Sequence, residues 1–552
     1  MADESYDEDF ERAIALSMQE QVQRNNVIDL TGDGDEDVSV ERKFQEDVRK
    51  AVALSKADSQ NSVSAPSQSR ASARPSLFLA ERAKMEEERR ERQRKRRRDA
   101  GLNSDPEETG SVKRQNRTRS PSAKPSSSAV DTSDVFYNGS WRPTATRFST
   151  PRRDGKATFR FTDVLGKKDE IAFAILSTYN LDLSWLYPFF DPSIPVILFM
   201  LLFHKSGRLR VVISTANLVD FDWRDIENFV WLQDIPRQEN PSTMNAKDTQ
   251  SFPAILQSVL RKLGVQAALD TMVQQGHPHL PLRCIDDLSK FWEFSAVKAH
   301  LVPSIVGKHT DWPNVIQTGH PRLMKAVRDM GLRAAGMRGL SLEYQGSSLG
   351  QYTSQWLNEF SHSARGESVE DWLRQSKKSR EQMPLPALKI MFPTKRTVHQ
   401  SALGEAGGGT IFCSRKKWKA PNFPRGLFHD SKSAGGPVLM HTKILVAKFT
   451  HSSHDGGHSD TETDEEPEEA QRPVGWAYVG SHNFSSAAWG TLSGSSFTPV
   501  LNVSNYEIGV VFPLRDAAAL ESVRVWQCPP PKYGRDDEPW IQEESAILAA
   551  AR

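Results

Sequence analysis

Apolar and polar positions divide the chain into a polar tail and two ordered regions. Residues 1–133 carry few large apolar side chains and are rich in Ser, Arg, Glu and Gln, so we expect a disordered tail without a hydrophobic core. After residue 134, apolar runs separated by turn residues begin. We place two ordered domains at 134–300 and 301–545. The second should contain a flexible loop at 451–471, because eight of the fifteen residues from Asp455 to Glu469 are acidic.

Short apolar runs predict the main elements of the two domains. In the first domain, residues 171–176 (IAFAIL) predict a helix. A turn at 205–207 (KSG) should lead into a strand at 209–213 (LRVVI). In the second domain, residues 444–447 (ILVA) and 476–479 (WAYV) predict two buried strands.

Polar residues stand at the ends of these two strands of the second domain. His441 and Lys443 precede residues 444–447, and Asn483 follows residues 476–479. Successive side chains of an extended chain point to opposite faces, so His441 and Lys443, two residues apart, should share a face. A Lys can hold phosphate oxygens, an Asn can orient them, and a His can attack phosphorus or move a proton. The pattern therefore predicts a compact anion site.

The first domain repeats only part of this pattern. Residues 210–218 (RVVISTANL) parallel residues 477–484 (AYVGSHNF), and Asn217 takes the place of Asn483. The preceding run has no His-x-Lys, because alignment of the two strands places Val196 opposite His441 and Leu198 opposite Lys443. The nearby His204 and Lys205 are adjacent in sequence and lie at the turn end of the strand. The predicted site is therefore complete on one side only.

At these residues the sequence resembles the tyrosyl-DNA phosphodiesterase family of the phospholipase D superfamily. The segments that carry the resemblance are Val211–Trp223 (VVISTANLVDFDW), Tyr344–Gly350 (YQGSSLG), Ser481–Gly490 (SHNFSSAAWG) and Asn505–Val510 (NYEIGV). The resemblance implies an α/β fold of two pseudo-symmetric phospholipase D-like domains, with mixed sheets flanked by helices. It also implies metal-free hydrolysis of a 3′-phosphodiester that links DNA to a tyrosine of a stalled topoisomerase, through a phospho-histidine intermediate, with no cofactor.

The resemblance also implies roles for individual residues. The acid/base His corresponds to His441, the phosphate-binding groups to Lys443, Asn217 and Asn483, a supporting carboxylate to Glu507, and the DNA contacts to Ser347, Ser348 and Ser485. The family's first His-x-Lys, which holds the nucleophile, has no counterpart, since residues 191–198 (DPSIPVIL) run directly into residues 199–201 (FML). This junction reads as a deletion, because the sequence on both sides remains similar to the family. We therefore expect impaired catalysis.

Composition and charge add information on the surroundings of the protein. The net charge is +1, so attraction to nucleic acid must come from local patches such as Arg94–Arg98, which also suggests import into the nucleus. The three cysteines are far apart and have no metal-ligand spacing, which favours a reducing compartment. The acidic N-terminus argues against a secretory signal, and the apolar run 194–203 is too short to cross a bilayer.

Two tail segments, 7–20 and 46–55, share an acidic, apolar, x, x, Ala, apolar, x, x, Ser pattern. On a helix the apolar, Ala and Ser positions form one narrow stripe, and the small residues keep it flat enough for a partner to approach closely. Both segments resemble ubiquitin-interacting motifs, whose small contact residues would be Ala13, Ser17, Ala51 and Ser55. The alternative is a pair of short amphipathic helices without a partner.

Between them, residues 27–37 (VIDLTGDGDED) place an apolar group before a run of acids. An extended apolar segment can add a strand to the sheet edge of a partner, while the acids meet a basic rim. The segment resembles a SUMO-interacting motif with contact residues Val27, Ile28 and Leu30. Patterns this short also arise by chance.

Three functions remain open at this point. The first is a nuclear DNA-repair phosphodiesterase that acts on single- and double-stranded DNA ends with 3′ adducts, including a topoisomerase-derived peptide, with ubiquitin and SUMO conjugates as partners of its tail. The second is a non-catalytic adaptor for DNA ends, ubiquitin and SUMO. The third is a phospholipase, which Asn217, Asn483 and the basic run disfavour. We expect a monomer without a membrane partner.

The tail motif gives a first testable prediction. Ala13→Arg and Ser17→Asp place a bulky or charged side chain on the flat stripe, so each should weaken capture of the full chain on immobilised ubiquitin. A pull-down that compares the variants with the unchanged chain measures the effect. If the unchanged chain does not bind ubiquitin, the motif has no such function.

Overall fold

The computed structural model describes residues 135–191, 193–197, 201–241, 249–274, 276–277, 280–334, 338–451 and 472–550. The predicted tail and its ubiquitin and SUMO motifs lie outside the described residues, as do Leu198 and residues 452–471 of the predicted acidic loop. The two strands that precede and follow this loop pair with each other in the structure.

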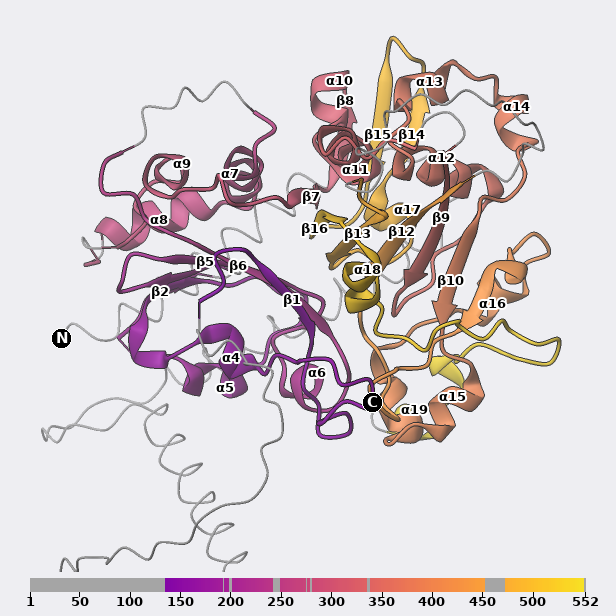
Figure 1. Cartoon of the computed structure of the whole chain (residues 1–552), viewed down its shortest axis with the longest axis horizontal. Helices are drawn as coiled ribbons and strands as arrows, with labels where there is room; N and C mark the ends of the chain where they lie inside the picture. Colours follow the sequence, from indigo (N-terminus) through magenta and orange to yellow (C-terminus); the bar gives the residue numbers. More distant parts are fainter. Residues whose placement is uncertain are drawn as a thin grey trace, which may run out of the picture. The chain divides into compact units, whose positions relative to one another are not determined.

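The first sheet has six strands (Figure 1). In spatial order they are β1 (Ser140–Pro143), β6 (Phe229–Ile235), β5 (Leu209–Ser214), β4 (Leu201–His204), β2 (Ile171–Ile175) and β3 (Val196–Ile197). β2 and β3 are parallel and the other neighbours are antiparallel, so the sheet is mixed. The strand predicted at 209–213 is confirmed.

Helices cover both faces of the first sheet. Figure 1 shows α7 (Phe252–Lys262), α8 (Val265–Gln274) and α9 (Asp287–Phe291) on one side, and α4 (Phe161–Leu165), α5 (Leu183–Leu186) and α6 (Asp220–Arg224) on the other. Side chains alternate between the two layers, since Val211 and Ile213 join one apolar cluster and Val212 joins the other. Because both faces are buried, the central strands are apolar throughout.

This burial explains one wrong prediction. Residues 171–176 were expected to form a helix, but Ile171–Ile175 form strand β2, which lies between β4 and the edge strand β3. A short apolar run without alternation fits a strand buried on both faces as well as it fits a buried helix. The partners β3 and β4, which decide the matter, lie further along the chain.

The second sheet has seven strands. In spatial order they are β11 (Phe428–Asp430), β10 (Leu388–Phe392), β9 (Arg338–Gln345), β12 (Ile444–His451), β13 (Gly475–Gly480), β16 (Glu507–Leu514) and β7 (His300–Ser304). A three-stranded sheet is formed by β14 (Thr491–Gly494), β15 (Pro499–Val503) and β8 (Gly307–Thr310). The helices of this half are α10 (Trp312–Val315), α11 (Gly319–Asp329), α12 (Ser354–Ala364), α13 (Val369–Arg374), α14 (Lys377–Glu381), α15 (Lys395–Gln400), α16 (Arg415–Lys419), α17 (Ser486–Trp489), α18 (Ala517–Val523) and α19 (Ala546–Ala550). The α/β fold class is confirmed.

The two sheets repeat each other strand by strand. β4, β5 and β6 pair in sequence, antiparallel, as β12, β13 and β16 do. β2 flanks β4 with parallel β3 beyond it, just as β9 flanks β12 with parallel β10 beyond it. The repeats differ most in one connection. Residues 393–443 link β10 to β12, whereas only residues 198–200 link β3 to β4.

The position of Val196 corrects the strand alignment made from the sequence. Val196 lies in β3 and pairs with Ala174 of β2, so β2 separates it from β4. Because β4 is the strand that corresponds to β12, Val196 does not lie opposite His441. Ile197 and Leu201 flank the same residue, Ile175, from opposite sides. The apolar run that reads as one strand in the sequence therefore belongs to two, because hydrophobicity alone does not mark where one short strand ends and the next begins.

The two halves share an apolar core. One buried cluster contains Val211 and Trp231 of the first sheet together with Val446, Val479 and Val510 of the second. We call this shared interface between the two halves the seam. At its edge, Trp141 of β1 stacks on Phe512 of β16 with ring centroids 4.7 Å apart, and Trp141 Nε1 donates to Ser522 Oγ at 2.9 Å. No described helix is long and apolar enough to cross a membrane.

The packing of Trp141 predicts how strongly the halves depend on each other. Trp141→Ala should lower the free energy of unfolding by about 2–4 kcal/mol, somewhat less than for a fully buried aromatic residue, because Trp141 is partly exposed. Ser522→Ala keeps the ring stack but removes the hydrogen bond from Trp141 Nε1 and the one that Ser522 Oγ donates to the Ala519 carbonyl oxygen, so it should cost about 1–2 kcal/mol. Urea unfolding measures both. Equal losses in the two variants would show that the ring stack contributes nothing.

Candidate active site

His441 and Lys443 lie directly before β12, at the seam between the halves. Lys443 Nζ is 2.9 Å from His441 Nε2 and 3.1 Å from Nδ1, and it donates to the His441 carbonyl oxygen at 2.9 Å. It also reaches the carbonyl oxygen of Thr215 in the first half, at 3.4 Å. Both side chains are buried, with 7% of His441 and 4% of Lys443 exposed. The prediction that they lie together on one side is confirmed.

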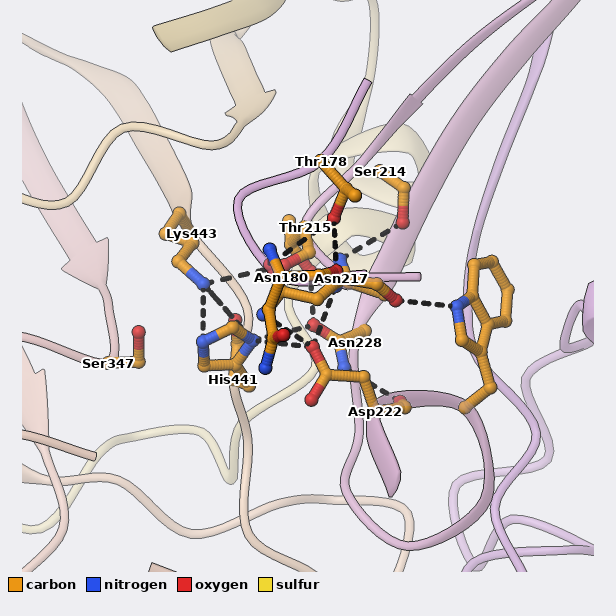
Figure 2. Close-up of polar contacts among 12 residues, drawn as sticks. Thr178, Asn180, Ser214, Thr215, Asn217, Asp222, Asn228, Ser347, His441 and Lys443 are labelled. Carbon is orange, nitrogen blue, oxygen red and sulfur yellow. Dashed lines mark hydrogen bonds and ion pairs between the residues drawn. The ribbon is translucent and has the colours of Figure 1, made fainter. Parts of the chain in front are cut away.

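Residues of the first half surround the His441 ring (Figure 2). His441 Nδ1 lies 3.2 Å from Asn228 Oδ1 and 3.5 Å from Asp222 Oδ2. Asn228 is itself held, because Thr215 Oγ1 donates to its Oδ1 at 2.8 Å and its Nδ2 donates to the Asp222 carbonyl oxygen at 2.9 Å. The ring of the predicted acid/base residue is therefore oriented by the opposite half of the molecule.

Asn217 follows β5 and is fixed at both ends of its amide. Its backbone nitrogen and its Nδ2 donate to Asp222 Oδ2 at 2.7 and 3.0 Å. Its Oδ1 accepts from Asn180 N at 3.2 Å and from Thr178 Oγ1 at 3.4 Å. Figure 2 shows Asn217 in the same network as His441 and Lys443. Within the part of the chain that the structure describes, the other Nδ2 proton of Asn217 has no partner and is available to a ligand.

Asn483 occupies the matching position after β13. Its Oδ1 accepts from Ser348 N at 3.1 Å and from Ser347 Oγ at 3.3 Å, which brings three residues of the predicted site together. Within the described residues, the side-chain amide nitrogen of Asn483 has no partner and can donate to an anion. Ser485 has a structural role, because its Oγ caps helix α17 by accepting from Ala488 N at 3.2 Å.

Glu507 begins β16, next to the Asn483 turn. Asn505 Nδ2 donates to Glu507 Oε1 at 3.3 Å, and Ser481 is bound to the same strand by the hydrogen bond from Ile508 N to Ser481 Oγ at 2.9 Å. Burial raises the pKa of the Glu507 carboxyl to about 7, while the charge of Lys443 acts to lower it. Glu507, the predicted supporting carboxylate, therefore interacts electrostatically with Lys443.

Burial dominates the protonation of the site. It lowers the pKa of His441 well below its usual range, and the positive charge of Lys443 lowers it further. Burial also lowers the pKa of Lys443 to about 7, although Asp222 and Glu507 act in the opposite direction. The carboxyl pKa of Asp222 is raised by burial as well, against the hydrogen bonds from Asn217. An anion bound here would stabilise the charged forms of His441 and Lys443.

Sequence reasoning missed Asp222, Asn228 and Thr215. Asp222 lies in the first turn of α6, within the segment that carries the family resemblance, and Asn228 directly precedes β6. Polar residues that precede or follow an apolar strand were available as a signal. Their partner His441 is more than two hundred residues away, so only the fold identifies them. Among the residues that the structure describes, no group of three or more His, Cys, Asp or Glu could hold a metal ion.

The lowered pKa of Lys443 predicts how anion binding depends on pH. Lys443 is charged below about pH 7 and loses its proton above it, so sulfate affinity should fall about tenfold from pH 6 to pH 8. Sulfate keeps its charge over this range, which makes calorimetric titration a direct measure. Glu507 ionises over the same range and acts in the same direction.

Two variants separate these groups. Lys443→Arg keeps the cation at all these pH values, and Glu507→Gln removes the carboxylate. The double variant should lose the part of the pH dependence that comes from Lys443 and Glu507, and the part that remains reports proton uptake by His441 when the anion binds. Affinity of the unchanged chain that stays constant over this range would contradict the assignment of Lys443 as the anion-binding cation.

Comparison with known proteins gives two family matches. The family model described as "Tyrosyl-DNA phosphodiesterase" matches residues 198–539, more than half of the chain, and begins at the link between β3 and β4. The model described as "Ubiquitin interaction motif" matches residues 7–21. This match confirms the first predicted motif, which contains Ala13 and Ser17. The second predicted motif at 46–55 stays a prediction.

Individual relatives agree with the family match. The chain is 26% identical over 308 residues to "Tyrosyl-DNA phosphodiesterase 1" of Arabidopsis thaliana, covering 55% of this chain and 44% of that protein. It is 24% identical over 350 residues to "Probable tyrosyl-DNA phosphodiesterase" of Caenorhabditis elegans, covering 62% and 66%. The chain thus spans between 44% and 66% of these relatives' length. A crystal structure of the yeast tyrosyl-DNA phosphodiesterase matches with a TM-score of 0.50 and 13% identity, over 73% of this chain and 100% of that one. The chain belongs to the tyrosyl-DNA phosphodiesterase family of the phospholipase D superfamily.

Proposed function

We propose that this chain binds blocked 3′ DNA ends, with a 3′-phosphotyrosyl end as the leading candidate, and that its cleavage of them is severely impaired. One observation carries both parts of the proposal. The site has one His-x-Lys in the second half, whereas residues 198–200, which are too few for another, link β3 to β4 in the first half. The phosphate-binding groups of both halves are retained.

The retained groups suit a phosphodiester. The ammonium of Lys443 and the free amide nitrogen of Asn483 can bind its non-bridging oxygens, and Asn217 can add a third donor. A bound phosphodiester brings negative charge next to His441 and raises its pKa toward neutrality. His441 can then donate a proton to the leaving tyrosine oxygen as a general acid. Ser347 and Ser348, joined to Asn483, lie where the DNA strand would follow.

The covalent step lacks its nucleophile. In the family reaction a His of the first half attacks phosphorus from the side opposite the leaving group, and a phospho-histidine forms. Here the first half offers Asp222, Asn217 and Asn228 to the site, and none is an imidazole. His204 cannot substitute, because it ends β4 at the turn before β5, whereas Asn217 follows the opposite end of β5.

Cleavage of a 3′-phosphotyrosyl oligonucleotide tests the proposal. The full chain should bind the oligonucleotide but turn it over at least about a thousandfold more slowly than the 1–1000 s⁻¹ that is typical of enzymes. Lys443→Met should weaken binding, because it removes the anion-binding cation. Lys448→Met, which changes an exposed lysine of β12, is the matched control and should bind as the unchanged chain does.

Each outcome of this assay is informative. Turnover at an ordinary enzymatic rate would refute the loss of catalysis. Equal binding by the unchanged chain and Lys443→Met would refute the assignment of the anion site.

A second proposal is a non-catalytic adaptor in the nucleus that holds DNA ends and ubiquitin, and also SUMO through residues 27–37. The match of residues 7–21 to the ubiquitin interaction motif supports it, together with the missing His-x-Lys. The cleavage assay also separates the two proposals. Residual cleavage that disappears in His441→Asn favours an impaired enzyme, and DNA-end binding without cleavage in both chains favours the adaptor.

A further inference from the structure

We propose that Arg152 and Glu227 are positioning residues that hold His441 in its place at the seam between the halves. The reaction that this serves rests on the proposed function, but the positioning itself does not. His441 needs such support, because it precedes strand β12 and has no ladder partner within the second sheet.

The backbone of Glu227 supplies the support for His441. Glu227 N donates to the carbonyl oxygen of Leu439 at 2.8 Å, and the carbonyl oxygen of Glu227 accepts from His441 N at 2.8 Å. These two bonds form an isolated bridge between Glu227 and Met440. A residue of the first half therefore fixes the chain on both sides of Met440, directly before the catalytic segment.

The side chain of Glu227 is anchored in turn by a buried ion pair. Its carboxylate accepts from Arg152 Nη1 and from Ser433 Oγ, the latter at 3.1 Å. Both charged side chains are 0% exposed. Arg152 is held from its other edge, since its Nε and Nη2 donate to Asp154 at 2.8 and 2.7 Å. These hydrogen bonds and charges raise the pKa of Arg152 against the effect of burial, so Arg152 is charged. Burial raises the pKa of the Glu227 carboxyl to about 7, while the charge of Arg152 and the hydrogen bond from Ser433 act to lower it.

Glycine makes room for this pair. A Cβ on Gly435 would lie 2.6 Å from Arg152 Cζ and 2.9 Å from a carboxylate oxygen of Glu227. The Gly435 carbonyl oxygen also accepts from Arg153 N at 3.0 Å. Arg152, Glu227 and the segment 433–435 thus come from three separate parts of the chain. They meet around the buried pair of Arg152 and Glu227. Glu227 in turn is hydrogen-bonded to Leu439 and His441.

A shift of Glu227 would reach His441 by two routes. The first is the bond from His441 N to the Glu227 carbonyl oxygen. The second is the next residue, Asn228, whose Oδ1 lies 3.2 Å from His441 Nδ1. Loss of the ion pair should therefore change the orientation of the imidazole as well as the stability of the fold. This double effect separates a positioning role from a purely structural one.

The test uses the full chain with the pair replaced by neutral groups of similar shape, Arg152→Met with Glu227→Gln. Replacing both partners avoids leaving one buried charge uncompensated. The control is Arg210→Met with Asp234→Asn, which removes another fully buried ion pair, located in β5 and β6 away from His441. It also removes the ion pair between Asp234 and Arg208. Nitrogen-15 resonances of the His441 ring report its orientation and tautomer. Fluorescence anisotropy gives the Kd for a 3′-phosphotyrosyl oligonucleotide.

We expect the Arg152/Glu227 variant to shift the His441 resonances and to weaken oligonucleotide binding about tenfold or more. The Arg210/Asp234 variant should leave both unchanged even though it also loses stability. If the two variants lose similar stability and the His441 resonances are unchanged in both, the pair has only a structural role and the proposal is wrong.

Two further outcomes are covered by the design. If the Arg152/Glu227 variant does not fold, Ser433→Ala removes a single hydrogen bond to Glu227 and should produce a smaller shift of the same His441 resonances. No shift in that variant would overturn the proposal. If the unchanged chain does not bind the oligonucleotide, the proposed function fails, while the ring resonances still decide whether Arg152 and Glu227 position His441.

Discussion

The structure depends on the burial of a lysine beside a histidine at the seam between two halves. Desolvation disfavours the charge of both groups, and at 2.9 Å each also disfavours the charge of the other. Groups of the first half offset part of this free-energy cost. Asp222 lies near His441 Nδ1, and the Thr215 carbonyl oxygen lies near Lys443 Nζ. Under the proposed function, a bound phosphate offsets this cost, because its negative charge favours the protonated forms of both groups.

The internal repeat explains which site residues could be predicted from the sequence. Asn217 and Asn483 follow corresponding strands, so comparison of the two halves identifies them without a structure. His441 and Lys443 share a side because the chain is extended before β12. These predictions use only local spacing. Asp222, Asn228 and Glu227 were not predicted from the sequence, because their roles depend on contacts with a segment about two hundred residues away. The strand at Ile171–Ile175 was misread for a related reason, since its neighbours on both sides come later in the chain.

Val196 shows the limit of aligning repeats by hydrophobicity. One apolar run covers β3, the link and β4, and the sequence offers no polar residue to divide it. The division follows from the sheet, where β2 lies between β3 and β4 and Ala174 pairs with Val196. Under the proposed function, the first half lacks a His-x-Lys. Val196 is then not a substitution for the missing His, because β3 corresponds to β10 and not to the strand that follows His441.

Simple geometry shows that a link of three residues between β3 and β4 is compatible with the rest of the first sheet. Ile197 and Leu201 flank Ile175 from opposite sides, so they lie about 10 Å apart, which is twice the spacing between neighbouring strands. The four Cα–Cα steps between them can reach about 14 Å. The link at 198–200 is therefore long enough to pass the end of β2, and the strand order can be kept. The proposed loss of the nucleophile therefore does not require loss of the fold, and Asp222 and Asn228 remain in place beside His441.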